Sequence, residues 1–247
     1  VQSFTLGGTQ IDVACFGSNS GSATVTVSRG TSPYTYAWSP AGGTQATASN
    51  LTAGTYTVTV QDATGAIATK EFIITQPPAL TTSGSQTNAF CNLSNGTATV
   101  TVSGGRGPYT YEWLSTGATT ATATGLSPGK HTVRVTDANG CTTTRDYAIA
   151  QPLALTVGAV ASPTPLCPGG TLSLQATAGG GTGTFTYDWS GPNGYDPAPT
   201  TTNPLTRVDA TAQFAGLYSV TVSDQNGCTA NAQSATVALS PVTSLPR

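Results

Sequence analysis

The sequence predicts an all-β protein built from several β-sandwich domains in tandem. Two observations support this prediction. The 247 residues include 29 Gly and 16 Pro among abundant Thr, Val and Tyr, a composition typical of short strands joined by tight turns. Apolar and polar residues also alternate with a period of two, as in residues 23–27 and 98–102, and no stretch of useful length shows helical periodicity.

Three near copies of one pattern occupy almost the whole chain. A tryptophan preceded by alternating aromatic residues recurs in each copy, at Trp38, Trp113 and Trp189. Each copy also contains an Asp-x-x-Gly turn, and the first two copies end in Gln-Pro. This repetition predicts domains at 1–77, 78–152 and 153–241, with 242–247 as the start of a further repeat or a linker.

Each repeat has the features of an immunoglobulin-like sandwich. Six or seven short strands in about 75 residues indicate two packed sheets, and the central tryptophan falls on a mid-chain strand. Tyr56 and Tyr218 lie at the place of a tyrosine corner, where repeat two has His131. We therefore expect three immunoglobulin-like domains arranged end to end, with Trp38, Trp113 and Trp189 as core aromatic residues.

The cysteines fall at equivalent places in the repeats. Cys91 and Cys167 lie near the first strand of repeats two and three, and Cys141 and Cys228 each follow an Asn-Gly turn in the same repeats. This equivalence predicts two disulfides within repeats, Cys91–Cys141 and Cys167–Cys228. Such regular bonds indicate an oxidising compartment.

Repeat one differs from the others at one of these places. Ala66 stands where repeats two and three have their second cysteine, so Cys15 has no partner within its repeat. We therefore expect Cys15 to be an unpaired thiol, either buried or linked outside the chain.

The composition excludes several classes of function. Charged residues make up 7% of the chain and the net charge is −2, so there is no basic surface for nucleic acid or anionic lipid. The single histidine, His131, has no nucleophile in its motif, and a metal site needs at least three ligands. We expect no enzyme activity, no cofactor, no metal and no membrane insertion.

The motifs resemble a known family of repeats. Cys, Pro-Tyr-x-Tyr-x-Trp, Gly-x-Tyr-x-Val-x-Val, Asp-x-Asn-Gly-Cys and a closing Gln-Pro are similar to the SprB-type repeats of gliding-bacterial surface adhesins. Repeats one and two match over nearly their full length, and repeat three resembles a related immunoglobulin-like or PKD-like module. The resemblance implies a very large extracellular or cell-surface protein, exported by the type IX route and used in adhesion and gliding.

Three groups of residues are candidates for binding. Tyr34, Tyr36 and Trp38 share one strand face and could stack on sugars, although core packing is the favoured interpretation. Asp137 and Asp224 with the Asn-Gly that follows could offer oxygens to Ca²⁺, but a hairpin turn explains the pattern better.

The third candidate is an insertion of about 11 residues in repeat three. It forms an irregular loop rich in Pro and Gly, and its candidate binding residues are Asn193, Tyr195 and Asp196. An additional structural hairpin is the favoured alternative to a binding loop.

The combined prediction is a non-catalytic repeat region of a large adhesin, acting as a stalk or an adhesive module. Its expected partners are neighbouring repeats of the same chain or like subunits, and surface polysaccharide. Two alternatives stay open: a subunit of a self-assembling extracellular filament joined by strand exchange and locked through Cys15, and a carbohydrate-binding accessory region of a secreted enzyme.

Overall fold

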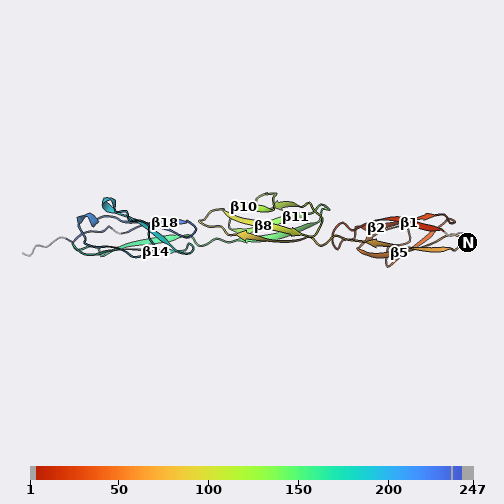
Figure 1. Ribbon diagram of the computed structural model, residues 1–247, viewed down its shortest axis with the longest axis horizontal. Helices are drawn as coiled ribbons and strands as arrows, with labels where there is room; N and C mark the ends of the chain where they lie inside the picture. Colours follow the sequence, from red (N-terminus) through yellow and green to blue (C-terminus); the bar gives the residue numbers. More distant parts are fainter. Residues whose placement is uncertain (1–3, 235, 241–247) are drawn as a thin grey trace, which may run out of the picture. The chain divides into compact units, whose positions relative to one another are not determined.

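The structure is a computed structural model that describes residues 4–234 and 236–240. Its strands form six three-stranded sheets, and every sheet takes its strands from a single repeat (Figure 1). The chain is therefore an all-β protein, as predicted. The expected further repeat at 242–247 lies outside the described residues.

The six strands of each repeat follow the same order. Repeat one has β1 (Thr5–Ile11), β2 (Gly21–Ser28), β3 (Thr35–Ser39), β4 (Thr47–Leu51), β5 (Gly54–Gln61) and β6 (Ile67–Ile74). Repeat two has β7 (Thr81–Thr87), β8 (Gly96–Ser103), β9 (Thr110–Trp113), β10 (Thr122–Leu126), β11 (Gly129–Thr136) and β12 (Thr142–Ile149). Repeat three has β13 (Thr156–Ser162), β14 (Leu172–Gly179), β15 (Thr186–Ser190), β16 (Leu205–Arg207), β17 (Ser219–Ser223) and β18 (Thr229–Gln233), with short 3₁₀ helices η1 (Pro192–Gly194) and η2 (Ala212–Phe214).

The strand order is that of an immunoglobulin-like sandwich. In repeat one, β1-β2-β4 form one sheet and β3-β5-β6 the other, and the corresponding strands form the same two sheets in repeats two and three. If the six strands are named A, B, C, E, F and G, the sheets are ABE and CFG, which is the immunoglobulin arrangement without strand D. The topology itself therefore confirms the predicted fold class.

By its contacts the chain divides into two compact units, which do not coincide with the repeats. The first unit extends to Gln86 and includes Ala98–Ala123 and Lys130–Tyr147. The second comprises Thr87–Thr97, Thr124–Gly129 and the chain from Ala148 onward. Repeat one thus lies wholly in the first unit and repeat three wholly in the second.

The alternating apolar residues of the two sheets form the core of each sandwich. In repeat one, Ala23 and Val25 of β2 lie in the same buried cluster as Val58 and Val60 of β5. Repeat three has an equivalent cluster that contains Leu174 of β14. The polar residues between them, mostly Thr, face outward, as a period of two requires.

A buried tryptophan lies opposite a valine in each CFG sheet. Trp38 pairs with Val58, Trp113 with Val133 and Trp189 with Val220. These tryptophans are 8%, 0% and 1% exposed. Tyr34 and Tyr36, on the same face as Trp38, are only half-buried at the edge of that core.

Two repeats contain the tyrosine corner that the sequence suggests. The hydroxyl of Tyr56 donates to the carbonyl of Thr52 at 3.2 Å, and that of Tyr218 donates to the carbonyl of Phe214 at 3.1 Å. In repeat two, His131 is buried at this position and its Nδ1 lies 2.7 Å from the hydroxyl of Ser115. The substitution therefore keeps a polar contact at the corner.

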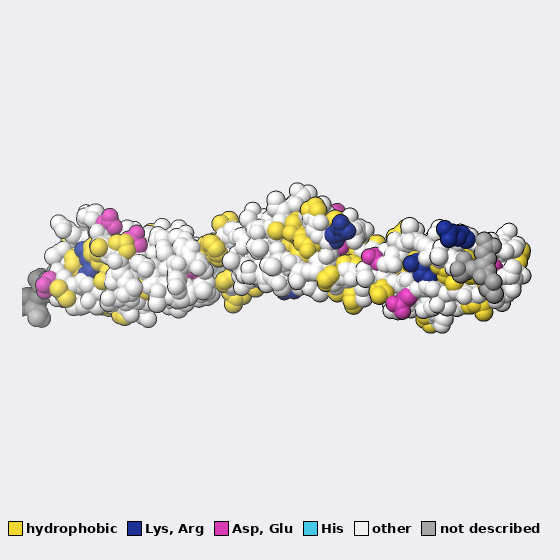
Figure 2. Space-filling view, turned by 45° about the vertical axis from the view of Figure 1, so that its right-hand side comes forward, with side chains coloured by type: hydrophobic (Ala, Val, Ile, Leu, Met, Phe, Trp, Pro, Cys, Tyr) yellow, Lys and Arg dark blue, Asp and Glu magenta, His cyan; other side chains and the backbone are white. Residues whose placement is uncertain are grey.

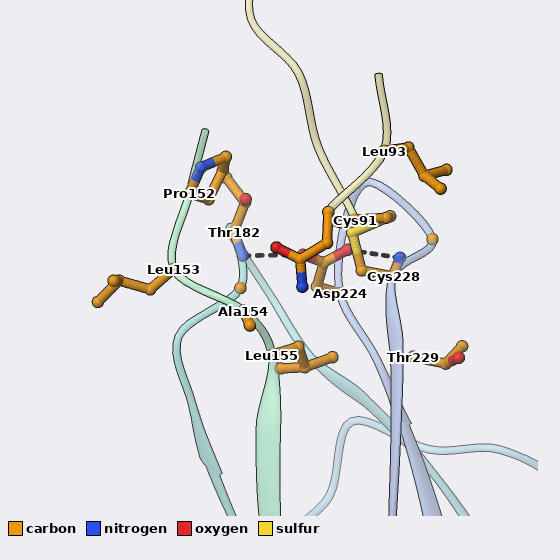
Figure 3. A pocket seen from close by; sticks show the side chains of 13 residues that line it. Cys91, Leu93, Pro152, Leu153, Ala154, Leu155, Thr182, Asp224, Cys228 and Thr229 are labelled. Atoms are coloured by element: carbon orange, nitrogen blue, oxygen red, sulfur yellow. Dashed lines mark hydrogen bonds between the residues drawn. A yellow bond between two sulfur atoms is a disulfide. The ribbon is translucent and has the colours of Figure 1, made fainter. Parts of the chain in front are cut away.

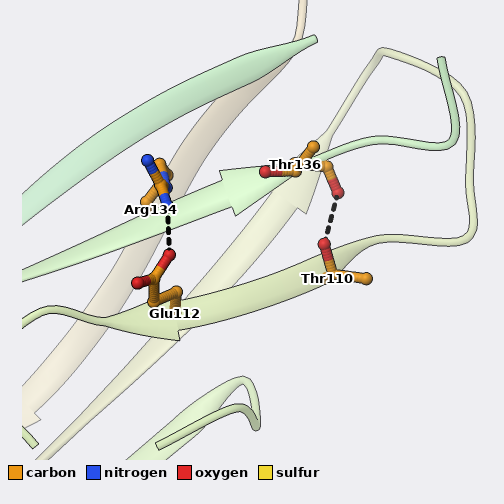
Figure 4. Close-up of polar contacts among 4 residues, drawn as sticks. All are labelled: Thr110, Glu112, Arg134 and Thr136. Atoms are coloured by element: carbon orange, nitrogen blue, oxygen red, sulfur yellow. Dashed lines mark hydrogen bonds and ion pairs between the residues drawn. The ribbon is translucent and has the colours of Figure 1, made fainter. Parts of the chain in front are cut away.

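Charged side chains are sparse on the surface. Most side chains on the face shown in Figure 2 are uncharged, with Lys, Arg, Asp and Glu scattered singly or in pairs. One ion pair joins Arg134 of β11 to Glu112 of β9, which lie opposite each other in the strand register (Figure 4). Both side chains are about half exposed, so the pair contributes little to stability.

Candidate functional site: the cross-linked joints

The cysteines join consecutive repeats. Cys15 of repeat one is bonded to Cys141 of repeat two, and Cys91 of repeat two is bonded to Cys228 of repeat three. Cys167 is exposed and free. The prediction of two disulfides within repeats was therefore wrong in its pairing, and so was the expectation that Cys15 is the unpaired thiol.

The physical reason lies in where the two kinds of cysteine are placed. The first cysteine of a repeat lies in the loop between strands A and B, and the second lies between strands F and G. Cα atoms must approach within about 7 Å to be bridged. The A–B loop of one repeat meets this condition with the F–G turn of the next, with Cα atoms 5.7 Å apart at Cys15–Cys141 and 5.0 Å apart at Cys91–Cys228.

A buried aspartate organises the F–G turn that carries the second cysteine. In repeat two, Asp137 Oδ1 accepts hydrogen bonds from the backbone N–H groups of Asn139 and Cys141, both at 2.9 Å. Its other oxygen, Oδ2, accepts from the N–H of Arg106 in the B–C loop at 3.0 Å. Gly140 adopts φ +82°, which glycine reaches without strain. The carboxylate thus fixes two loops and the position of Cys141.

The same arrangement recurs in the other repeats. Asp224 Oδ1 accepts from the N–H groups of Asn226 and Cys228, and its Oδ2 accepts from that of Thr182, all at 2.9 Å. Asp62 of repeat one accepts from Thr64 and from Ala66, the residue that replaces cysteine. The Asp-x-x-Gly motif is therefore a turn stabilised by its own carboxylate, which is the interpretation that the sequence favoured over a calcium loop.

These hydrogen bonds affect the ionisation of Asp137 and Asp62. Burial of Asp137 opposes its ionised form, but backbone N–H groups, that of Arg106 first, outweigh this effect and lower its pKa below the ordinary 3.8. The hydroxyl of Thr64 and the surrounding N–H groups likewise lower the pKa of Asp62. Both side chains are therefore held as carboxylates at neutral pH.

In the first joint, two further hydrogen bonds reinforce the disulfide. The Asn139 side chain donates from Nδ2 to the carbonyl of Ala14 at 2.8 Å, next to Cys15. Gln76, from the Gln-Pro that ends repeat one, accepts from the N–H of Gly17 at 2.7 Å. Small cavities of about 270 and 250 Å³ lie beside these contacts. Sequence reasoning missed both side chains, although the recurrence of Gln-Pro was a visible signal.

In the second joint, Cys91 and Cys228 lie beside a cavity of about 320 Å³ (Figure 3). Its lining combines Leu93 with Leu155 of repeat three and the carboxylate-bearing turn at Asp224. Gln151 Nε2 donates to Asn92 Oδ1, so the second Gln-Pro also fastens the loop that carries the first cysteine. The two joints therefore use the same parts.

The insertion of repeat three packs onto its own domain. The guanidinium of Arg207 lies 3.8 Å from the ring centroids of both Tyr195 and Phe214, and Arg207 donates to the hydroxyl of Tyr218 at 2.5 Å. Asn193 Nδ2 donates to the carbonyl of Gln213 at 2.9 Å.

Of the three predicted loop residues, two therefore make contacts within the domain. Tyr195 packs on Arg207, and Asn193, although exposed, holds the hydrogen bond to Gln213, while Asp196 is exposed. Burial raises the pKa of Tyr195, with the Arg207 charge acting against it. Within the described residues there is no cluster of three or more His, Cys, Asp or Glu side chains that could hold a metal.

One protein-family model matches parts of repeats one and two. A model of the SprB repeat matches residues 7–43 and 83–119, so the resemblance seen in the sequence is confirmed at the corresponding segments of repeats one and two. No curated protein matches the chain. No helix among the described residues is long and apolar enough to cross a membrane.

Two solved structures resemble the chain over nearly its whole length. Three N-terminal domains of the Highly Immunogenic Outer Capsid protein of bacteriophage RB49 are 19% identical, with a TM-score of 0.46 over 98% of this chain and 100% of that one. The titin fragment I67-I69 is 14% identical, with a TM-score of 0.41 over 97% and 98% of the two chains. The six sheets and their registers, not these likenesses, establish the fold.

Proposed function

We propose that the chain is a non-catalytic repeat region of a large extracellular adhesin, in which it acts as a stalk, an adhesive module or both on the cell surface. The observation that carries this proposal is the pair of disulfides between consecutive repeats. Bonds of this kind persist in oxidising compartments, and they fasten one repeat to the next without touching the sandwich cores. We further propose that the repeats are domains bounded at 1–77, 78–152 and 153–241.

Three other observations support an extracellular array. Two segments match the SprB repeat, which by resemblance points to export by the type IX route and to adhesion during gliding. Charged residues make up only 7% of the chain, which suits contact with neutral polysaccharide. Most of the conspicuous side chains, including the tryptophans and the turn aspartates, serve packing and loop geometry, so the joints are the distinctive chemistry of the chain.

The free thiol favours a second candidate partner, a further repeat of the same type. Cys167 occupies the place that Cys15 and Cys91 occupy in the earlier repeats, where each is bonded to the repeat that follows. A partner cysteine after an Asp-x-Asn-Gly turn, in a later repeat or in a like subunit, would extend the series of bonds. Cys15 is bonded within the chain and is not available to lock filament subunits together.

The proposal is tested on intact cells that express the parent protein. Antibodies against residues 78–152 should label unpermeabilised cells, external protease should remove the label, and deletion of the repeats should reduce attachment of the cells to a glycan-coated or glass surface. Labelling that needs permeabilisation would contradict the proposal. Binding of the isolated chain to insoluble glycans would favour the accessory-region alternative, and ordered fibres in electron micrographs would favour the filament.

A further inference from the structure

The two disulfides overlap along the chain. Their cysteines occur in the order 15, 91, 141 and 228, and the bonds join the first to the third and the second to the fourth. The loops closed by these bonds span 126 and 137 residues and share the segment 91–141. Neither loop can therefore be extended independently of the other.

Each disulfide is a point at which two parts of the chain are covalently joined, here called a node. Three separate stretches of chain connect the two nodes. One node is Cys15–Cys141 and the other is Cys91–Cys228, and the stretches between them are 15–91, 91–141 and 141–228. A pulling force applied at the two ends passes through both nodes. The nodes cannot separate further than the shortest stretch allows, which is 91–141 in repeat two.

We propose that the overlapping disulfides act as an extension limiter, which caps the length to which the chain can be stretched even when its domains unfold. An extended chain spans at most about 3.6 Å per residue, so segment 91–141 limits the separation of the nodes to about 180 Å. Without the bonds, residues 15–228 would reach about 770 Å. The bonds therefore remove about three quarters of the reach of this region.

The limiter deepens the proposed function, on which it rests for its biological meaning. A surface stalk under load would unfold and lengthen if its domains were joined only by their linkers. Here much of repeats one and three lies on the two longer stretches, so this part of the chain cannot be drawn out to its full length while both disulfides hold. This upper limit on the extended length does not depend on what the adhesin binds.

The test is single-molecule force spectroscopy on the full chain held by its two ends. The measured quantity is the greatest end-to-end length of the stretched chain, called the ceiling below. With both disulfides intact, only residues 1–15, 91–141 and 228–247 contribute to it, and the expected ceiling is about 300 Å. Cys15→Ser with Cys141→Ser should raise it to about 390 Å, and Cys91→Ser with Cys228→Ser to about 430 Å. All four substitutions, or a reductant added to the unchanged protein, should give about 890 Å.

The pattern across the variants identifies the overlap. Removing one bond gains about 90 or 130 Å, whereas removing both gains about 590 Å, more than twice the sum of the two, because the loops share 91–141. Disulfides within repeats would instead give a starting ceiling of about 490 Å and gains that add, and that result would overturn the inference. Cys167→Ser is the matched control and should leave the ceiling unchanged.

The force measurement separates the limiter from the proposed function. The ceiling depends only on covalent connectivity, so a variant that folds poorly still reports it once its remaining bond is verified on a non-reducing gel. Failure of the cell-surface labelling would contradict the adhesin and leave the ceiling intact, whereas a wrong ceiling would contradict the limiter and leave the labelling intact.

Discussion

The central tryptophan of each repeat combines burial with a specific hydrogen bond where the local loop permits it. Trp38 Nε1 donates to the carbonyl of Gln45 at 2.9 Å, and Trp113 Nε1 donates to that of Thr120 at 3.0 Å. Each acceptor lies seven residues after its tryptophan. In repeat three the insertion occupies that stretch, and Trp189 Nε1 has no acceptor among the described residues. The insertion has thus replaced a loop that served the core.

Truncation of a core tryptophan should destabilise its repeat strongly. Trp113→Ala removes a side chain that is 0% exposed, and such changes cost about 3–5 kcal/mol. Urea denaturation followed by circular dichroism measures this loss. The adjacent Leu114 is 59% exposed, so Leu114→Ala should stay within about 0.5 kcal/mol of the unchanged protein. Equal effects of the two substitutions would show that Trp113 is not a core residue.

The turn aspartates should make the protein sensitive to acid. Because the folded pKa of Asp62 and Asp137 lies below the ordinary 3.8, each stabilises the fold above that pH and loses its contribution as the pH falls through the folded pKa. The urea midpoint, measured between pH 7 and pH 2, should therefore fall in the most acidic part of the range.

Substitution of Asp137 tests whether this acid sensitivity arises from the turn. Asp137→Asn should lower the midpoint at pH 7 and flatten its decline in acid, since the charge that accepts three backbone N–H groups is gone. Asp196→Asn removes an exposed carboxylate and serves as the control. A variant Asp137→Asn with the full acid response of the unchanged protein would contradict this role.

At the scale of elements, the strands and turns were predictable from sequence, whereas the partners of the loops were not. A period of two and the Asp-x-x-Gly motif depend on nearest neighbours, so they identify β2, β8 and the F–G turns directly. The cysteines are different. Pairing within repeats leaves Cys15 unpaired, whereas pairing between consecutive repeats leaves Cys167 unpaired. Both schemes use four of the five cysteines, so the count does not distinguish them. Only the placement of the A–B and F–G loops decides between them.

The sequence predicted that the insertion is irregular, but it did not predict how the insertion packs. Its contacts bring together Tyr195, Phe214 and Tyr218, which are separated by up to 23 residues, around a single cation. Local sequence offers no signal that Arg207, on β16, is that cation. The prediction of a binding loop at Asn193, Tyr195 and Asp196 therefore remains untested as binding, although the first two residues have structural roles.

Removal of the Arg207 guanidinium should release the insertion. Arg207→Ala should expose the segment 191–217 to chymotrypsin while the sandwich cores stay resistant, and Arg207→Lys should rescue it only in part, because an ammonium lacks the planar stacking surface. Cation–π contacts of this kind contribute about 0.5–2 kcal/mol. Arg134→Ala, which breaks only the exposed pair with Glu112, should leave the cleavage pattern unchanged.

At the scale of the whole molecule, the repeats are held in series by covalent bonds rather than by linkers alone. At each joint a disulfide lies beside one hydrogen bond of a Gln-Pro glutamine: Gln76 accepts from Gly17, and Gln151 donates to Asn92. The first joint adds the Asn139 contact. Repetition of the joint along the chain is what connects the fold to the proposed adhesin. The sequence predicted the repeats and the oxidising compartment, and the structure supplies the connectivity on which the proposed extension limiter rests.

The disulfide connectivity is tested most directly by peptide mapping of the non-reduced protein purified from the cell surface. Cleavage by trypsin after Lys and Arg places each of the five cysteines on a peptide of its own. Mass spectrometry should find the Cys15 peptide joined to the Cys141 peptide, the Cys91 peptide joined to the Cys228 peptide, and Cys167 in neither pair. Recovery of Cys91 joined to Cys141 and of Cys167 joined to Cys228 would contradict the account of the joints.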